Sequence, residues 1–443
     1  MRHKPFLLLL TLVLGSTGAA RAQDVLPLER AVQDALAHNQ TLHAARASVD
    51  EAGAGRRQAV AALAPRVSVS ESWQRGDQPV FVFSSLLSAR RFAASNFAID
   101  ALNHPNPVGF FRTSVGVEQV LFDGGQRRAG ATAAAHAVEV ARATLDETAA
   151  GIAVSVSEAY GRVLAAQAAR RAAESGLESA REDVARAERR RTAGLATDAD
   201  VLTLRVHVAD LEERVIRAGG DLAVARGQLN QLTGSPLDRD FAVAEPVEAT
   251  APAATVPLAD LFAEAARKRP DLARASAAAR GAEAGVTAAR ATLFPQVGAQ
   301  AAVDVSGTRI NDRTSNWIVG GELRWTFSLG GADLARRAAA AAAAARARSE
   351  QAAAMSAAQL DVLTATRRLE AAQARRATGL AAVEQARESQ RIIRNRFDAG
   401  LAGVTDVLQA STAVLDAEAR ATAARVDVMV GQAHLRRALG RTP

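Results

Sequence analysis

Residues 193–202 read AGLATDADVL, and residues 399–408 read AGLAGVTDVL. The two stretches share an Ala-Gly-Leu-Ala start and an Asp-Val-Leu end, and corresponding residues lie 206 positions apart. Glycine can adopt the left-handed conformation that ends a helix, so each stretch predicts a turn between two helices. We call these stretches the first and second tips, and we expect two equivalent helical hairpins.

The duplication extends toward the N-terminal side of each tip, but with a different offset. Leu28, Ala35, Leu42, Ala45 and Pro65 recur 230 positions later as Leu258, Ala265, Leu272, Ala275 and Pro295. Because the offset then falls to 206, the first half holds 24 additional residues. They lie within residues 77–110, which contain Pro79, Pro105 and Pro107 and are expected to form a long loop.

The distribution of proline and glycine sets the limits of the long helices. Proline is absent from residues 108–235 and 296–442, and each span holds a Gly-Gly pair followed by an Ala- and Arg-rich run. Proline disrupts helix interiors, whereas alanine and arginine favour helix. The sequence predicts hairpins over 126–233 and 332–440, with return helices from about 198 and 404. Each outgoing helix is expected to be roughly 100 Å long. Shorter helices are expected at about 40–63 and 270–293.

Four segments alternate between apolar and polar residues, as a strand with two different faces does. They are about 65–74, 111–122, 295–305 and 316–327. Each has about the length that a tilted strand needs to cross a bilayer. Trp73, Trp317 and Trp325 are suited to a membrane interface. A half-buried soluble sheet shows the same alternation. Because the smallest bacterial barrels have eight strands, four strands per chain predict oligomerisation.

The N-terminus has the pattern of an export signal. Residues 1–22 combine Arg2 and Lys4, an apolar run and an Ala-Arg-Ala end. We therefore divide the chain into a signal peptide (1–22), a first repeat (23–234), a linker (235–257) and a second repeat (258–443). The net charge of +7 falls by three when the signal leaves, and the remaining basic residues are mixed with acidic ones. Nucleic-acid binding is therefore not expected.

The sequence offers little for catalysis or for cofactor binding. It contains no cysteine, and its histidines are scattered. His38 and His43 are five residues apart, whereas two metal ligands on one helix face are three or four residues apart. It contains no phosphate-binding loop and no nucleophile elbow. We expect no catalytic residue, no metal and no cofactor.

In the order and spacing of its motifs, the mature chain resembles the TolC family of outer-membrane efflux channels. The motifs are Leu121-Phe122-Asp123-Gly124-Gly125, Gln231-Leu232-Thr233-Gly234, Arg269-Pro270-Asp271-Leu272 and the two tips. The resemblance implies a mainly α fold with transmembrane β-structure. In it, duplicated helical hairpins form a periplasmic α-barrel, and four strands from each of three chains form a 12-stranded outer-membrane barrel.

The resemblance also implies partners and a role. A homotrimer in outer-membrane lipid would accept substrates from an inner-membrane pump, of RND or ABC type, through a periplasmic adaptor. Drug efflux and type I secretion are both open. Gly194, Leu195, Gly400 and Leu401 match the turns where the adaptor docks, although such turns also simply end helices. The alternative is a periplasmic adaptor, which would have one hairpin, or a structural coiled-coil protein. A purely periplasmic coiled coil would appear in an osmotic-shock fraction.

The resemblance further implies a gate at the periplasmic end. Asp406 matches an acidic ring position, Asp200 matches an acidic residue of the closed-state network, and Gln409 stands where a second acidic ring is found. An Asp near a helix start is more often a cap, so we favour the gate role more for Asp406 than for Asp200. Phe397 and Ala402 replace the tyrosine and arginine that tie the closed tip. A different latch is therefore expected, with Arg394, Arg396 and Asp398 as candidate ion-pair residues.

Overall fold

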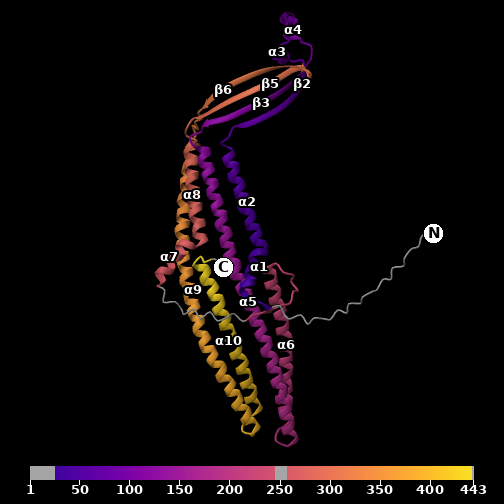
Figure 1. The fold of residues 1–443 in the computed structure, drawn as a ribbon, viewed down its shortest axis with the longest axis vertical. Helices are drawn as coiled ribbons and strands as arrows, with labels where there is room; N and C mark the ends of the chain where they lie inside the picture. The colour runs from indigo at the N-terminus through magenta and orange to yellow at the C-terminus, as the bar shows by residue number, and fades with distance from the viewer. Residues whose placement is uncertain (1–24, 245–256, 442–443) are drawn as a thin grey trace, which may run out of the picture. The chain divides into compact units, whose positions relative to one another are not determined.

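The computed structural model describes residues 25–244 and 257–441, so the signal peptide 1–22 and most of the 235–257 linker lie outside the described residues. Four long helices form two hairpins, α5 with α6 and α9 with α10 (Figure 1). Their bounds are α5 Gln126–Thr192, α6 Asp198–Thr233, α9 Ala332–Asp398 and α10 Val404–Ala438. The two outgoing helices, α5 and α9, are each 67 residues long. Both the start and the end of α9 therefore lie 206 positions after those of α5, the same offset as between the two tips.

A pair of shorter helices precedes the first strand of each repeat. They are α1 Leu28–His38, α2 Gln40–Ala61, α7 Leu258–Lys268 and α8 Pro270–Ala291. Helices were expected at the positions of α2 and α8 but not at those of α1 and α7, although apolar residues of α1 and α7 recur in the duplication. Pro270 occupies the first turn of α8, where proline is tolerated. In the first repeat, Asn39 ends α1 and donates from Nδ2 to the Leu232 carbonyl oxygen, 3.0 Å away.

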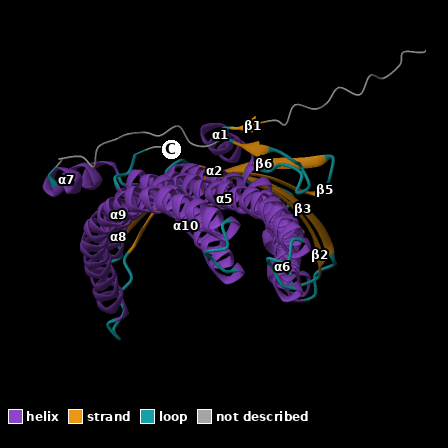
Figure 2. Ribbon diagram, turned by 90° about the horizontal axis from the view of Figure 1, so that it is seen from below, coloured by secondary structure: helices purple, strands orange, loops and turns teal. Residues whose placement is uncertain are grey.

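The four long strands form one antiparallel sheet in the order β2-β3-β5-β6 (Figure 2). Their bounds are β2 Arg66–Gly76, β3 Val108–Phe122, β5 Gln296–Arg309 and β6 Asp312–Arg324. The central β3–β5 pairing joins the two repeats. A separate parallel pair consists of β1 Val25–Leu26 and β4 Ala242–Val243.

Residues in register across the sheet form alternating polar and apolar rows. One row consists of Ser70, Ser114, Asp304 and Asn316, and the next of Val69, Val115, Val303 and Trp317. Successive rows point to opposite faces. On the apolar face Val69 is 70% and Trp317 78% exposed in the single chain. This face is suited to contact hydrocarbon, and the opposite face is suited to contact water.

The connection between β2 and β3 differs from the expected loop. Residues 77–110 contain α3 Pro79–Ser88, the short 3-10 helix η1 Ala94–Phe97 and α4 Ile99–Asn103, and β3 begins at Val108. The prediction of a loop was wrong because Pro79 stands at the start of a helix, where it is favourable, rather than inside one. We call residues 79–103 the insertion.

The last strand ends earlier than the alternation indicated. The expected strand 316–327 stops at Arg324, so Trp325 and Phe327 lie beyond it. The Trp325 indole Nε1 instead donates to the Leu293 carbonyl oxygen at 3.2 Å. At their other ends, β5 and β6 are longer than expected, and only residues 310–311 separate them.

The chain forms two compact units, each built from both repeats. Within the described residues, the first unit comprises 25–39, 152–244 and 370–430, and the second comprises 40–151, 257–369 and 431–441. In the first unit, Gly161 lets α5 approach α10 closely, because a Cβ there would lie 2.6 Å from Val426. The expected fold class, duplicated long hairpins plus four strands, is confirmed for the single chain. Within the described ranges, the structure has no helix of sufficient length and hydropathy to cross a membrane.

Candidate functional site at the hairpin tips

Both tips have the same helix-ending geometry. The N–H groups of Leu195 and Leu401 donate to carbonyl oxygens five residues earlier, each at 2.8 Å. Gly194 has a φ of +73° and Gly400 a φ of +78°, which is the left-handed conformation expected at these positions. Both leucines are 69% exposed. In this cap the residue after glycine often packs back on its helix, but here it projects into solvent.

The first return helix begins with a reciprocal cap. The Asp200 N–H donates to Thr197 Oγ1 at 3.2 Å, and the Thr197 N–H donates back to Asp200 Oδ2 at 2.9 Å. The hydrogen bond from the Thr197 backbone, together with one from its hydroxyl, lowers the pKa of Asp200. Asp200 Oδ2 thus accepts from both the N–H and the hydroxyl of Thr197, and Asp200 has the geometry of a capping residue.

The second return helix begins with a simpler cap. Gly403 replaces the threonine, and its N–H donates to Asp406 Oδ2 at 2.9 Å. The side chain of Asp406 is exposed, as is that of Gln409 one turn later. Val407, between them, is buried and 2% exposed. Asp406 and Gln409 therefore lie on a solvent-accessible face of α10.

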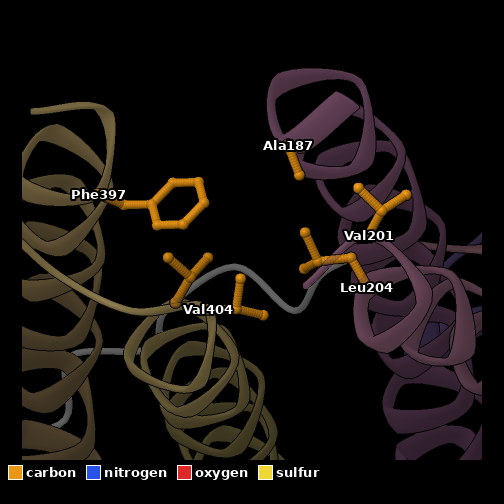
Figure 3. Close-up of a cluster of buried hydrophobic side chains, with 6 residues drawn as sticks. Ala187, Val201, Leu204, Phe397 and Val404 are labelled. Atoms are coloured by element: carbon orange, nitrogen blue, oxygen red, sulfur yellow. The ribbon is translucent and has the colours of Figure 1, made fainter. Parts of the chain in front are cut away.

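The two hairpins share a hydrophobic core beside their tips. Residues from α5 and α6 meet residues from α9 and α10, and their side chains point toward one another (Figure 3). The buried members are Ala187, Val201, Leu204, Phe397, Val404 and Val407. Ala402 packs against this core, which we call the tip core. Both Phe397 and Ala402, the positions that depart from the family pattern, thus contribute packing rather than polar contacts.

Charged contacts beside the tip core link the hairpins. Asp183 on α5 accepts from Arg186 of its own helix and from Arg394 of α9, each at 3.1 Å. The carboxylate side chain is only 8% exposed. The Arg190 guanidinium carbon lies 4.7 Å from the centre of the Phe397 ring, a cation–π contact. We call Asp183, Arg394, Arg190 and Phe397 the interhairpin latch.

The latch was only partly anticipated from the sequence. Arg394 was a candidate ion-pair residue without an assigned partner, and Asp183 and Arg190 were not identified. In sequence, Asp183, Arg190 and Arg394 do not differ from the charged residues that cover any solvent-exposed helix surface. The signal that pointed to them was indirect, namely the loss of polar groups at Phe397 and Ala402. In the parts of the chain that the structure describes, no group of three or more acidic or histidine side chains could bind a metal.

Comparison with known proteins gives a family and a fold. The family model described as outer membrane efflux protein matches residues 31–235 and 261–441. Three similar solved structures are the outer-membrane channel OprN, VceC from Vibrio cholerae and the Campylobacter jejuni channel CmeC. Their identities are 22%, 20% and 15%, and their TM-scores are 0.75, 0.76 and 0.80. The alignments cover 93%, 94% and 93% of this chain and 89%, 96% and 85% of theirs. No curated protein sequence matches the chain significantly.

Proposed function

The chain belongs to the outer membrane efflux protein family, and from that premise we propose that three copies form one exit duct fed by an inner-membrane pump through a periplasmic adaptor. Family membership places the protein in the outer membrane, with a tunnel in the periplasm. In this proposal the duct is a passage and catalyses nothing. Its cargo is either small toxic compounds or a secreted polypeptide.

Assembly into a trimer follows from the sheet. Its edge strands, β2 and β6, have no second partner within the described chain, and an open edge is not tolerated in lipid. Four strands are too few to close a barrel, whereas three copies supply twelve. The exposed valines and tryptophans of the apolar face then contact hydrocarbon. Two hairpins and four strands in one chain also favour this role over that of a periplasmic adaptor.

The tips carry the gate and the docking site. Threefold symmetry would repeat Asp406 around the bore, and such a ring favours cations. The interhairpin latch holds the α9–α10 hairpin against α5, so its release would widen the entrance. The observation that most directly supports docking is the equal exposure of Leu195 and Leu401 at 69%, because leucine held in solvent at two equivalent turns is suited to an apolar contact with a partner.

The basic test is assembly and conduction. The purified full chain in detergent should have the mass of three protomers by light scattering, and it should form ion-conducting channels in planar bilayers. A monomer without conductance would contradict the proposal. A cell fraction that contains the protein in the periplasm rather than the outer membrane would contradict it as well.

A further inference from the structure

The insertion lies on the polar face of the sheet, at the end of the strands away from α2 and α8 (Figure 1). The Ser88 carbonyl oxygen accepts from Asn316 Nδ2 at 3.0 Å and from Ser306 Oγ at 3.5 Å. Phe81 packs edge-on against Phe110, with ring centres 6.4 Å apart. Asn316, Ser306 and Phe110 all belong to the rows on the polar face.

Two arginines fix the insertion to the opposite hairpin of the sheet. Arg90 donates from Nη2 to the Ser315 carbonyl oxygen at 3.2 Å. Arg91 pairs with Asp312 and donates to Thr308 Oγ1 at 3.1 Å. Arg90 also has a φ of 55°, an unfavourable conformation for a non-glycine residue. The insertion therefore leaves the sheet from one edge strand, β2, and is held at the hairpin that contains the other edge strand, β6.

The insertion exposes several large apolar side chains. Val80 is 82%, Ile99 78% and Phe97 64% exposed. The charged side chains of the insertion are Arg90, Arg91 and the exposed Asp100, and the two arginines bind the β5–β6 hairpin. A loop that simply faces water does not need such a surface, and contiguous exposed apolar residues usually mark an interface.

We propose that the insertions of the three copies pack against one another through Val80, Phe97 and Ile99 and narrow the extracellular exit of the duct. The inference rests on the proposed trimeric barrel. In a closed barrel the apolar face contacts lipid and the polar face lines the lumen, so the insertion lies inside the mouth. Threefold symmetry then brings the same apolar surface of each copy toward the axis. The occupant of the surface is therefore a second copy of this chain.

Disulfide crosslinking tests the contact directly, because the native chain contains no cysteine. Ile99→Cys should give disulfide-linked protomer pairs after oxidation of the purified trimer. The matched control is Trp317→Cys, which has the same 78% exposure but lies on the apolar face; it should give none within a trimer. An Ile99→Cys trimer that stays unlinked overturns the inference. Loss of the trimer itself in the unmodified chain would instead contradict the proposed function.

A deletion tests the constriction. Gly76 and Val108 pair with each other, so an Asn-Gly turn can join them in place of residues 77–107. The tip gate and the exit lie in series, so a closed tip would hide a change in the resistance of the exit. The deletion is therefore measured in an Arg394→Ala background, in which the proposed tip gate is released. We expect the deletion to raise the single-channel conductance of this background by a factor of about two or more, because the proposed constriction at the exit is removed. Unchanged conductance in trimers of this variant overturns the constriction.

Discussion

Arg394 on α9 binds Asp183 on α5 through an ion pair with an Nη2–Oδ2 distance of 3.1 Å. The other carboxylate oxygen, Oδ1, accepts from Arg186 of the same hairpin at 3.1 Å. The carboxylate is thus shared between one guanidinium from each hairpin. The side chain of Phe397, which lies nearby, has no group that can form a hydrogen bond. The polar link between the hairpins is therefore made by Asp183 and Arg394, not by a residue at position 397.

The first prediction concerns this ion pair. Arg394→Ala leaves the buried Asp183 carboxylate without its partner on α9, and because Arg186 still binds it, the cost is about 2 kcal/mol, as for the loss of one hydrogen bond to a charged group. We expect the α9–α10 hairpin to separate from α5 and the single-channel conductance in planar bilayers to rise. Arg375→Ala is the control, because its ion pair with Asp427 is exposed and exposed pairs contribute at most about 1 kcal/mol. Equal conductance for the two variants would contradict the latch.

The second prediction separates the two roles of Asp406. Asp406→Asn retains an oxygen that can accept from the Gly403 N–H, so α10 should keep its cap, but the ring loses its charge. We expect reduced cation preference, measured as the reversal potential in a salt gradient. Asp406→Ala should raise the conductance or reduce the same preference. Gln409→Glu should increase cation preference by adding a second ring. If the reversal potential is unchanged in all three, Asp406 is not in the gate.

The third prediction assigns Asp200 to the helix cap. Thr197→Ala removes the hydroxyl that accepts from the Asp200 N–H and should destabilise the start of α6 by about 1 kcal/mol. The effect should appear as faster amide hydrogen exchange at the first tip. The cap lowers the pKa of Asp200, so its contribution is present above the ordinary pKa and is lost as the pH falls through the lowered one. Asp200→Ala should leave the reversal potential unchanged, and a shift comparable to that of Asp406→Asn would refute this assignment.

The fourth prediction concerns adaptor docking. Leu195→Asp combined with Leu401→Asp should abolish export, because two apolar contacts with the adaptor are replaced by charges. The measurement uses a strain in which deletion of the gene raises sensitivity to a toxic compound. The double variant should be as sensitive as the deletion, while the purified protein remains a conducting trimer. Leu237→Asp, at a leucine that is 66% exposed and lies beyond the C-terminal end of α6, away from the tip, is the control. Full resistance in the double variant would remove these leucines from docking.

The hairpins could be predicted because their signals are local. A glycine with positive φ marks each tip, and proline is absent from the four long helices, so the positions of Gly194 and Gly400 fix the ends of α5 and α9. The strands likewise follow from alternation between neighbouring residues. The exception is the end of β6, where Trp325 continues the alternation but its indole bonds to Leu293 outside the sheet.

The latch and the insertion could not be predicted because they depend on contacts between distant segments. Asp183 and Arg394 are 211 residues apart, and neither has a distinctive local pattern. In residues 77–110, Pro79, Pro105 and Pro107 favoured a loop, yet Phe81 of α3 packs against Phe110, and Val82 and Phe110 are each only 5% exposed. Tertiary packing of this kind overrides the local preference.

The last prediction is a pH dependence at the C-terminal end of the chain. Arg441 binds Glu264 of α7 with both Nε and Nη2, at 3.0 and 2.9 Å, and Lys268 binds the same carboxylate. These bonds, that of Arg441 foremost, lower the pKa of Glu264 from 4.5 to about 2. Their stabilisation is therefore complete above about pH 4.5 and is progressively lost as the pH falls toward 2. Arg441→Gln should speed amide exchange near residue 441 at pH 6, and the difference from the wild type should shrink at pH 2.5. Arg346→Gln, which removes an exposed ion pair with Glu350, is the control, and it should leave the amide exchange near residue 441 unchanged at both pH values. A difference that is equally large at both pH values would show that Glu264 does not anchor this end.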